Sequence, residues 1–126
     1  MRVFVARTFV RWASREGIAD EALLKAAFET VEGRHEADLG GLLFKKRIAR
    51  AGGGKSGGYR TIIGFRKGAS EKVVFLYGFA KNDRENLLET EMRALAKLAR
   101  TFFDAEEDAL AALVARRVFG ELVVGQ

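Results

Sequence analysis

The spacing of apolar residues changes at Leu43, and this change constrains the fold more than any other feature of the chain. Before Leu43 apolar side chains recur at helical intervals, and after it they alternate with a period of two. The alternation predicts three strands, over residues 43–50, 59–66 and 72–81. A short turn, residues 67–70, separates the last two strands, so we expect them to pair as an antiparallel hairpin.

Two helices are predicted before these strands, following a short strand at residues 2–6. The first helix carries Phe9 and Trp12 on one face and ends near Gly17. Asp20 is expected to cap the second helix, because its side chain can accept a hydrogen bond from a free backbone N–H group.

A long helix is predicted after the strands, with Asn82 and Glu85 as its N-terminal cap. Its apolar stripe consists of Leu88, Met92, Leu95, Ala99 and Phe102. Asp104 is expected to cap a last helix, and residues 122–124 can add a terminal strand. This order of elements predicts an α+β fold, in which helices cover one face of a small antiparallel sheet.

The composition excludes several classes of protein. The 126 residues fit a single domain, residues 1–126, with 48% apolar residues for its core. Cysteine is absent and His35 is the one histidine, which argues against thiol catalysis and His/Cys metal sites, so we expect no cofactor. The longest apolar stretch, residues 73–80, is too short to cross a bilayer, and the apolar run at residues 3–6 is too short for a secretory signal. We therefore expect a cytoplasmic protein without a membrane partner.

Basic residues are concentrated in the middle of the chain. Between Leu43 and Arg84 there are 11 basic and two acidic residues, a net charge of +9 in a chain whose total is +5. Such a segment is typical of a surface that binds phosphates. A lysine-rich sheet edge that opposes aggregation would show the same charge, so both interpretations stay open at this point.

Alternate residues of a strand share a face, and this rule groups several candidate residues. Lys45 and Arg47 share one face, and Arg60 lies on a face of the next strand. If the strands pair in a suitable register, the three cations converge and could bind a phosphodiester. The alternative is three separate surface cations. On the third strand, a shared face is expected for Phe75, Tyr77, Phe79 and Lys81.

Three segments of the chain resemble toxins of the RelE/ParE superfamily, and especially its HigB-like branch. They are residues 43–48 (LFKKRI), residues 57–66 (GGYRTIIGFR) and residues 75–84 (FLYGFAKNDR). The resemblance implies a RelE-like fold and the toxin of a type II toxin–antitoxin pair. Such toxins are metal-independent endoribonucleases that cut messenger RNA on the ribosome and so inhibit translation.

The resemblance also implies which residues act. Lys45 and Arg47 match the paired basic residues of the family's strand, and Arg60 matches the arginine of its YR motif. We expect Arg60 to stabilise the pentacovalent phosphate and Lys45 or Arg47 to position it. Lys45 is the expected proton carrier, because neighbouring cations can lower the pKa of a lysine.

Further residues are candidates for RNA contacts. They are Lys55, Tyr59, Tyr77, Lys81 and Arg84. Tyr59 could instead be a core residue. The expected partners are the ribosome, messenger RNA and a cognate antitoxin with a helix-turn-helix domain. Part of the antitoxin contact could lie on apolar surface at Phe102, Phe103 and Val118.

The chain departs from the family's nucleases at two positions. Asn82 stands where a further arginine is typical, and Leu88 stands where a helix carries a tyrosine that acts as base. Lys81, Arg84 and Tyr77 are the candidates to replace them. Two alternatives to a nuclease therefore stay open: a ParE-like inhibitor of DNA gyrase, and a non-catalytic module that binds RNA or protein.

Overall fold

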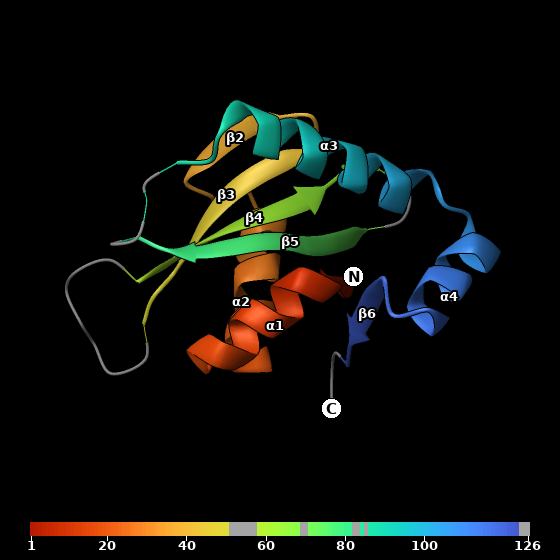
Figure 1. Cartoon of the computed structure of the whole chain (residues 1–126), viewed down its shortest axis with the longest axis horizontal. Coiled ribbons are helices and arrows are strands. Elements are labelled where there is room, and N and C mark those ends of the chain that lie inside the picture. Colours follow the sequence, from red (N-terminus) through yellow and green to blue (C-terminus); the bar gives the residue numbers. More distant parts are fainter. Residues whose placement is uncertain (51–57, 69–70, 82–83, 85, 124–126) are drawn as a thin grey trace.

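The computed structural model describes residues 1–50, 58–68, 71–81, 84 and 86–123 of the chain (Figure 1). In these residues it contains one six-stranded sheet and four helices. The strands are β1 (Arg2–Ala6), β2 (Ala37–Gly40), β3 (Leu43–Ile48), β4 (Tyr59–Phe65), β5 (Lys72–Ala80) and β6 (Phe119–Leu122). The helices are α1 (Arg7–Glu16), α2 (Asp20–Val31), α3 (Glu89–Asp104) and α4 (Glu107–Ala115). The predicted α+β class is confirmed.

The strands are arranged in the order β2-β3-β4-β5-β1-β6. β4 and β5 form the predicted antiparallel hairpin, and the described pairings are antiparallel except that β1 and β5 are parallel. A parallel pair needs a long connection between its strands, and the segment from α1 to β4 supplies it.

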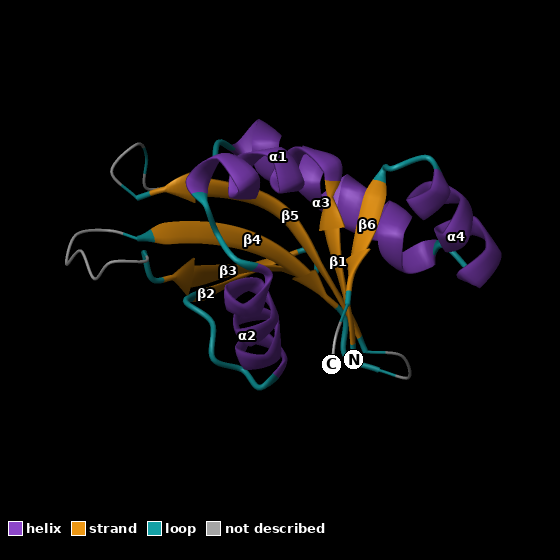
Figure 2. Cartoon of the chain, turned by 90° about the horizontal axis from the view of Figure 1, so that it is seen from below, coloured by secondary structure: helices purple, strands orange, loops and turns teal. Residues whose placement is uncertain are grey.

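Helices cover both faces of the sheet, whereas the sequence analysis predicts one covered face. Figure 1 shows α3 on one side of the sheet and α1 with α2 on the other, and Figure 2 views the molecule from the α1 and α2 side. Phe75, which pairs with Val5, packs on Phe9 of α1 with ring centroids 5.0 Å apart. Phe4 points to the other face and packs on Phe102 of α3, also at 5.0 Å. β4 is buried along its whole length, and a sheet buried on both faces needs a cover on each.

A β-bulge in β5 determines which side chains share a face. Ile62 pairs with Tyr77, whereas the next residue of β4 pairs with Phe75, so one residue of β5 is extra. Directly paired residues point to the same face, and Phe75 therefore faces α1 while Tyr77 faces the α3 side. The prediction that Phe75 shares a face with Tyr77, Phe79 and Lys81 is wrong, because alternation does not continue through a bulge.

Gly78 lies directly against α1. A Cβ atom at this position would overlap the ring of Trp12. The Trp12 ring is half-buried and packs on Phe9 and on Tyr59, with centroid distances of 5.6 and 5.4 Å. The absence of a side chain at Gly78 thus allows α1 to approach the sheet closely.

The predicted caps of α2 and α4 are wrong. α2 begins at Asp20 itself, after Ala19, and α4 begins at Glu107, whereas Asp104 ends α3. Neither Ala19 nor Glu106, the two N-cap residues, makes a side-chain capping hydrogen bond. Asp20 lies in the first turn of α2, and Glu107 and Asp108 lie in that of α4, where a carboxylate interacts favourably with the helix dipole.

α3 begins later than predicted, at Glu89. The predicted cap, Asn82 with Glu85, lies outside the described residues. The N-cap residue is Leu88, whose N–H donates to Glu91 Oε1 at 2.8 Å. Leu88 is 64% exposed and is therefore not part of the apolar stripe to which the sequence analysis assigned it.

The sequence analysis also missed one strand and shifted another. β2 was not predicted, because only four residues form it and a register shift interrupts its pairing with β3. β6 lies at Phe119–Leu122 rather than at residues 122–124, of which Val124 is outside the described residues. No helix of the described chain is both long and apolar enough to cross a membrane.

Candidate functional site

The pairing of β3 with β4 brings three predicted cations to one face of the sheet. Arg47 lies directly opposite Arg60, and Lys45 lies opposite Ile62. Alternation along β3 and β4 places all three cations on the face that α3 covers further along, where Phe103 approaches Gly64. We call Lys45, Arg47 and Arg60 the basic triad.

Arg60 is the least exposed member of the basic triad. Its side chain is 9% exposed, and its Nε donates to Glu36 Oε1 at 2.8 Å. Glu36 lies in the segment before β2 and is half-exposed, so its carboxylate reduces the repulsion between Arg60 and Arg47 across the strands. The carboxylate also holds the guanidinium of Arg60 in one orientation.

Lys45 and Arg47 are more accessible. Lys45 Nζ donates to Asn86 Oδ1 at 3.3 Å, and it makes no ion pair with a carboxylate of the described residues. Arg47 is exposed and forms neither a hydrogen bond nor an ion pair through its side chain within the part of the chain that the structure describes. Both cations can therefore contact an anion that arrives from solvent.

Arg84 and Tyr77 lie beside the basic triad. Arg84 pairs with Glu91 of α3, with its Nη1 3.1 Å from Oε2, and donates to the backbone oxygen of Asn86. The guanidinium also lies over the rings of Phe79 and Tyr77, at 5.6 and 6.0 Å from their centroids. The hydrogen bonds from Arg84 and from the Leu88 N–H hold the pKa of Glu91 below its usual value. Arg84 thus fastens the end of β5 to the start of α3.

Tyr59 is not part of this surface. Its ring is 4% exposed, faces α1 and meets Trp12 edge-to-face, and its hydroxyl donates to the Glu16 carbonyl at 3.4 Å. The ring is therefore a core residue and is not available for stacking on a base. Its sequence neighbour Arg60 points the other way because adjacent strand residues face opposite sides.

The remaining candidates for RNA contacts are Lys81 and Lys55. Lys81 is exposed directly after β5, and its backbone N–H donates to the carbonyl of Gly58 at 3.2 Å. Lys55 lies outside the described residues.

Three acceptors beside the basic cations were missed by the sequence analysis: Glu36, Asn86 and Glu91. All three lie outside β3, β4 and β5, so strand alternation could not indicate that they approach the cations. The sequence around Glu36 does not indicate its partner Arg60, because their contact depends on how β2 pairs with β3.

The arrangement can bind and stabilise a phosphate group. The described residues contain no cluster of three or more His, Cys, Asp or Glu side chains that could hold a metal ion. Arginine presents a rigid fork of donors that matches phosphate oxygens, and a cation oriented in advance needs no reorganisation when charge develops. The geometry therefore fits a phosphodiester whose transition state gains negative charge.

One comparison with known proteins identifies a family. The family model described as "RelE toxin of RelE / RelB toxin-antitoxin system" matches residues 1–122, which is nearly the whole chain. No curated protein and no solved structure matches the chain.

Proposed function

Since the chain belongs to the family of RelE toxins of RelE/RelB toxin–antitoxin systems, we propose that it inhibits translation by cutting messenger RNA on the ribosome without a metal ion. The observation that carries this proposal is the basic triad, which lies on one face of the sheet through the pairing of β3 with β4. The motifs at residues 57–66 and 75–84 favour the HigB-like branch of the family. A ribosomal target would place the protein in the cytoplasm.

The reaction is an internal transfer of the phosphate. The 2′-oxygen of the ribose forms a bond to the adjacent phosphorus, and the bond to the 5′-oxygen of the next nucleotide breaks. The 2′-hydroxyl loses its proton and the departing 5′-oxygen gains one. The pentacovalent phosphate carries additional negative charge, so cations held around it lower the barrier.

Each member of the basic triad has a distinct place in this reaction. Arg60, held by Glu36, stabilises the charge that develops on the phosphate. Arg47 is exposed and positions the phosphodiester with its forked donors. Lys45, beside the neutral amide of Asn86, carries the proton between the two oxygens.

Tyr77 and Lys81 supply contacts to the RNA. Tyr77 lies on the same face as the basic triad and is half-buried, with the Arg84 guanidinium 6.0 Å from its ring centroid. Leu88, at the position where the family has a helix tyrosine, is exposed at the start of α3 and offers no acid or base. In the proposed mechanism Lys45 therefore transfers the proton, and Arg84 holds the end of β5 against the start of α3.

A cognate RelB antitoxin is the partner that this family implies. We expect it to be a small helix-turn-helix protein encoded next to the toxin. Phe102 and Phe103 are buried, so they do not form the exposed apolar contact that the sequence analysis considered for it.

Induction of the protein in growing cells tests the proposal. We expect growth to stop and new 5′ ends to appear inside translated messages, and neither effect to occur with Arg47→Ala. Lys97→Ala, an exposed cation of α3 outside the triad, is the control that should act as the wild type. Growth arrest with inhibited gyrase and intact messages would support the ParE-like alternative, and no arrest would support the binding module.

A further inference from the structure

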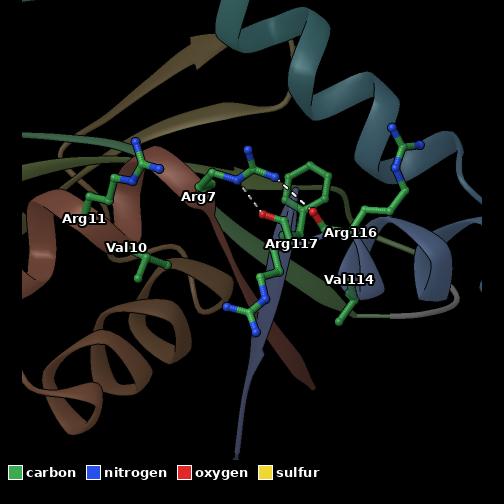
Figure 3. A pocket seen from close by; sticks show the side chains of 8 residues that line it. Arg7, Val10, Arg11, Val114, Arg116 and Arg117 are labelled. Atoms are coloured by element: carbon green, nitrogen blue, oxygen red, sulfur yellow. Dashed lines mark hydrogen bonds between the residues drawn. The ribbon is translucent and has the colours of Figure 1, made fainter.

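An open pocket of about 530 Å³ lies where α1, the end of α4 and β6 meet (Figure 3). Its lining includes Arg7, Val10, Arg11, Val114, Arg116 and Arg117. We call it the arginine pocket. α1 lies on the face of the sheet opposite the basic triad, so the pocket is separate from the proposed catalytic surface.

Four arginines and no acidic residue line the arginine pocket. Arg7 fixes its shape, because its Nε donates to the Arg117 carbonyl at 2.8 Å and its Nη2 donates to the Arg116 carbonyl at 2.9 Å. The side chains of Arg11, Arg116 and Arg117 are exposed and make no hydrogen bond or ion pair among the described residues. Three positive charges therefore surround the pocket without a carboxylate partner there.

α1 adds to this positive potential. The helix begins at Arg7, it has no acidic residue in its first turn, and no side chain caps its N-terminus. The Arg7 N–H donates to the Val118 carbonyl at 3.2 Å, but no acidic side chain of the first turn offsets the partial positive charge of the helix N-terminus next to Arg7 and Arg11. Acidic side chains occupy the first turns of the other three helices, which makes the start of α1 the exception.

The pocket also contains apolar surface. Val10 is 42% exposed, Val114 is half-buried, and the buried ring of Phe119 closes the inner side. An apolar floor inside a cationic rim is complementary to a segment that combines carboxylates with an aliphatic side chain. RNA fits less well, because no exposed aromatic ring lines the pocket for stacking on bases.

We propose that the arginine pocket binds an acidic, amphipathic segment of the cognate antitoxin. An aliphatic side chain of that segment packs on Val10 and Val114, and its carboxylates pair with Arg11, Arg116 and Arg117. This inference rests on the proposed function for the identity of the partner. It gives the antitoxin an anchor that leaves the basic triad uncovered, so toxin and antitoxin can remain joined while the rest of the antitoxin blocks the ribosome by its bulk.

Peptide binding tests the chemistry of the pocket. The probe is a short fluorescein-labelled peptide in which Leu recurs at helical spacing among Glu residues, and its anisotropy reports the dissociation constant. We expect Arg11→Glu/Arg116→Glu to weaken binding by about tenfold or more, because like charges then meet in the interface. Val10→Asp should also weaken it, and the matched control Lys25→Glu/Arg100→Glu, which reverses two exposed helix cations elsewhere, should not.

The variants avoid Arg7, whose loss would detach α1 from the end of α4, and circular dichroism checks that each variant is folded. Equal affinity of the pocket variant and the control for the peptide would overturn the proposal. So would a loss of affinity for a single-stranded RNA of similar length without a loss for the peptide.

Neutralisation of toxicity tests the identity of the partner. The product of the reading frame next to the toxin should protect cells from the wild-type protein and protect them less from Arg11→Glu/Arg116→Glu. That variant should remain as toxic as the wild type when expressed alone, because it leaves the basic triad intact. Equal protection from both would overturn the antitoxin as occupant. A wild-type protein that is harmless would instead contradict the proposed function, while the peptide result would still decide the pocket.

Discussion

Arg60 is a charged side chain that the fold holds almost out of solvent, next to a second cation, Arg47, and paired with the carboxylate of Glu36. A buried arginine of this kind contributes little net stability, because desolvation offsets its attraction to the partner. Its position on a strand opposite Arg47 therefore supports our proposal that the basic triad binds a phosphodiester. The same residue is therefore the best place to separate activity from stability.

Replacing Arg60 should slow cleavage strongly without unfolding the protein. We expect Arg60→Ala to lower the cleavage rate about 10²–10³-fold, the effect of removing one oriented donor from a charged transition state. Arg60→Lys should restore little of the rate, since an ammonium group lacks the forked geometry of the guanidinium. Cleavage of a translated message and thermal unfolding would be measured in parallel.

The matched control for Arg60 is Lys97→Ala, which removes an exposed cation of α3. In Arg60→Ala the half-exposed carboxylate of Glu36 can be hydrated, so this variant should lose about 1 kcal/mol in the free energy of unfolding. Wild-type cleavage by a folded Arg60→Ala protein would remove Arg60 from the site.

Gly78 offers a test of packing at a single residue. Gly78→Ala would drive a Cβ into the Trp12 ring, and we expect a loss of about 1–3 kcal/mol in the free energy of unfolding, the range for overpacked cores. Gly120→Ala is the control, because its Cβ would meet Val5 at an ordinary contact distance of 3.5 Å. Urea denaturation would compare the two variants, and equal stability would contradict the close approach of α1 to β5.

At the scale of elements, apolar periodicity was sufficient to find the three central strands and the helices around them. β3, β4 and β5 end within two residues of their predicted limits. Periodicity failed where a short element depends on its neighbour, as β2 does on β3. It also failed where the N-cap residue has no polar side chain to mark the start of the helix, as with Leu88 before α3.

The candidate site was predictable only in part, for a related reason. Alternation predicted that Lys45 and Arg47 share a face. It could only suggest that Arg60 joins them, because the sequence of neither strand determines the register in which β3 pairs with β4. The bulge in β5 separated Phe75 from Tyr77, and a bulge has no strong sequence signal. For Tyr59 the sequence left an RNA contact and a core position open, and its packing on Trp12 decides for the core.

A cluster of ion pairs joins β1 to β6 and α4. Arg2 donates to both carboxylate oxygens of Glu121 at 2.8 Å and to Glu107 at 3.0 Å, and Lys72 also pairs with Glu107 at 2.9 Å. The hydrogen bonds from Arg2 lower the pKa of Glu121, and those from Lys72 and then Arg2 lower the pKa of Glu107. Both carboxyl groups are thus harder to protonate in the folded protein than in the unfolded chain.

This cluster predicts a loss of stability in acid. A carboxyl group whose pKa is lowered by folding stabilises the protein above its unfolded pKa of about 4.5, and this contribution disappears as the pH falls through the folded value. We expect the free energy of unfolding to fall as the pH drops below about 4.5 and Glu107→Gln/Glu121→Gln to flatten that fall. Urea unfolding across a pH series measures it, with Glu21→Gln as the exposed control; an unchanged slope in the double variant would contradict the role of the cluster.

At the scale of the whole molecule, the described residues include two separate cationic surfaces. One is the basic triad on the α3 side of the sheet, and the other is the arginine pocket beside α1. The sequence concentrates charge between Leu43 and Arg84, and the remaining residues sum to −4. The net charge of these residues gave no indication of the arginine pocket, because its arginines come from both ends of the chain and approach one another only in the folded protein.

Binding of RNA should depend strongly on salt. Each phosphate neutralised on a single strand contributes a slope of about −0.7 to log K against log[salt], so the three cations of the basic triad predict a slope of about −2 or steeper. Arg47→Ala should make the slope shallower by about 0.7, whereas Lys97→Ala should leave it unchanged. Anisotropy titrations of a labelled single strand would measure this, and a nearly flat response would favour a protein-binding function.

The most direct measurement of the central claim is the fate of a defined message incubated with the purified protein in a reconstituted translation reaction. Primer extension would compare the message on ribosomes with the same message free in solution. Our account predicts cuts within the translated region when ribosomes are present, no comparable cuts in the free message, and none with Arg47→Ala or Arg60→Ala. Intact messages on ribosomes treated with folded wild-type protein, or equal cutting by the basic-triad variants, would contradict it.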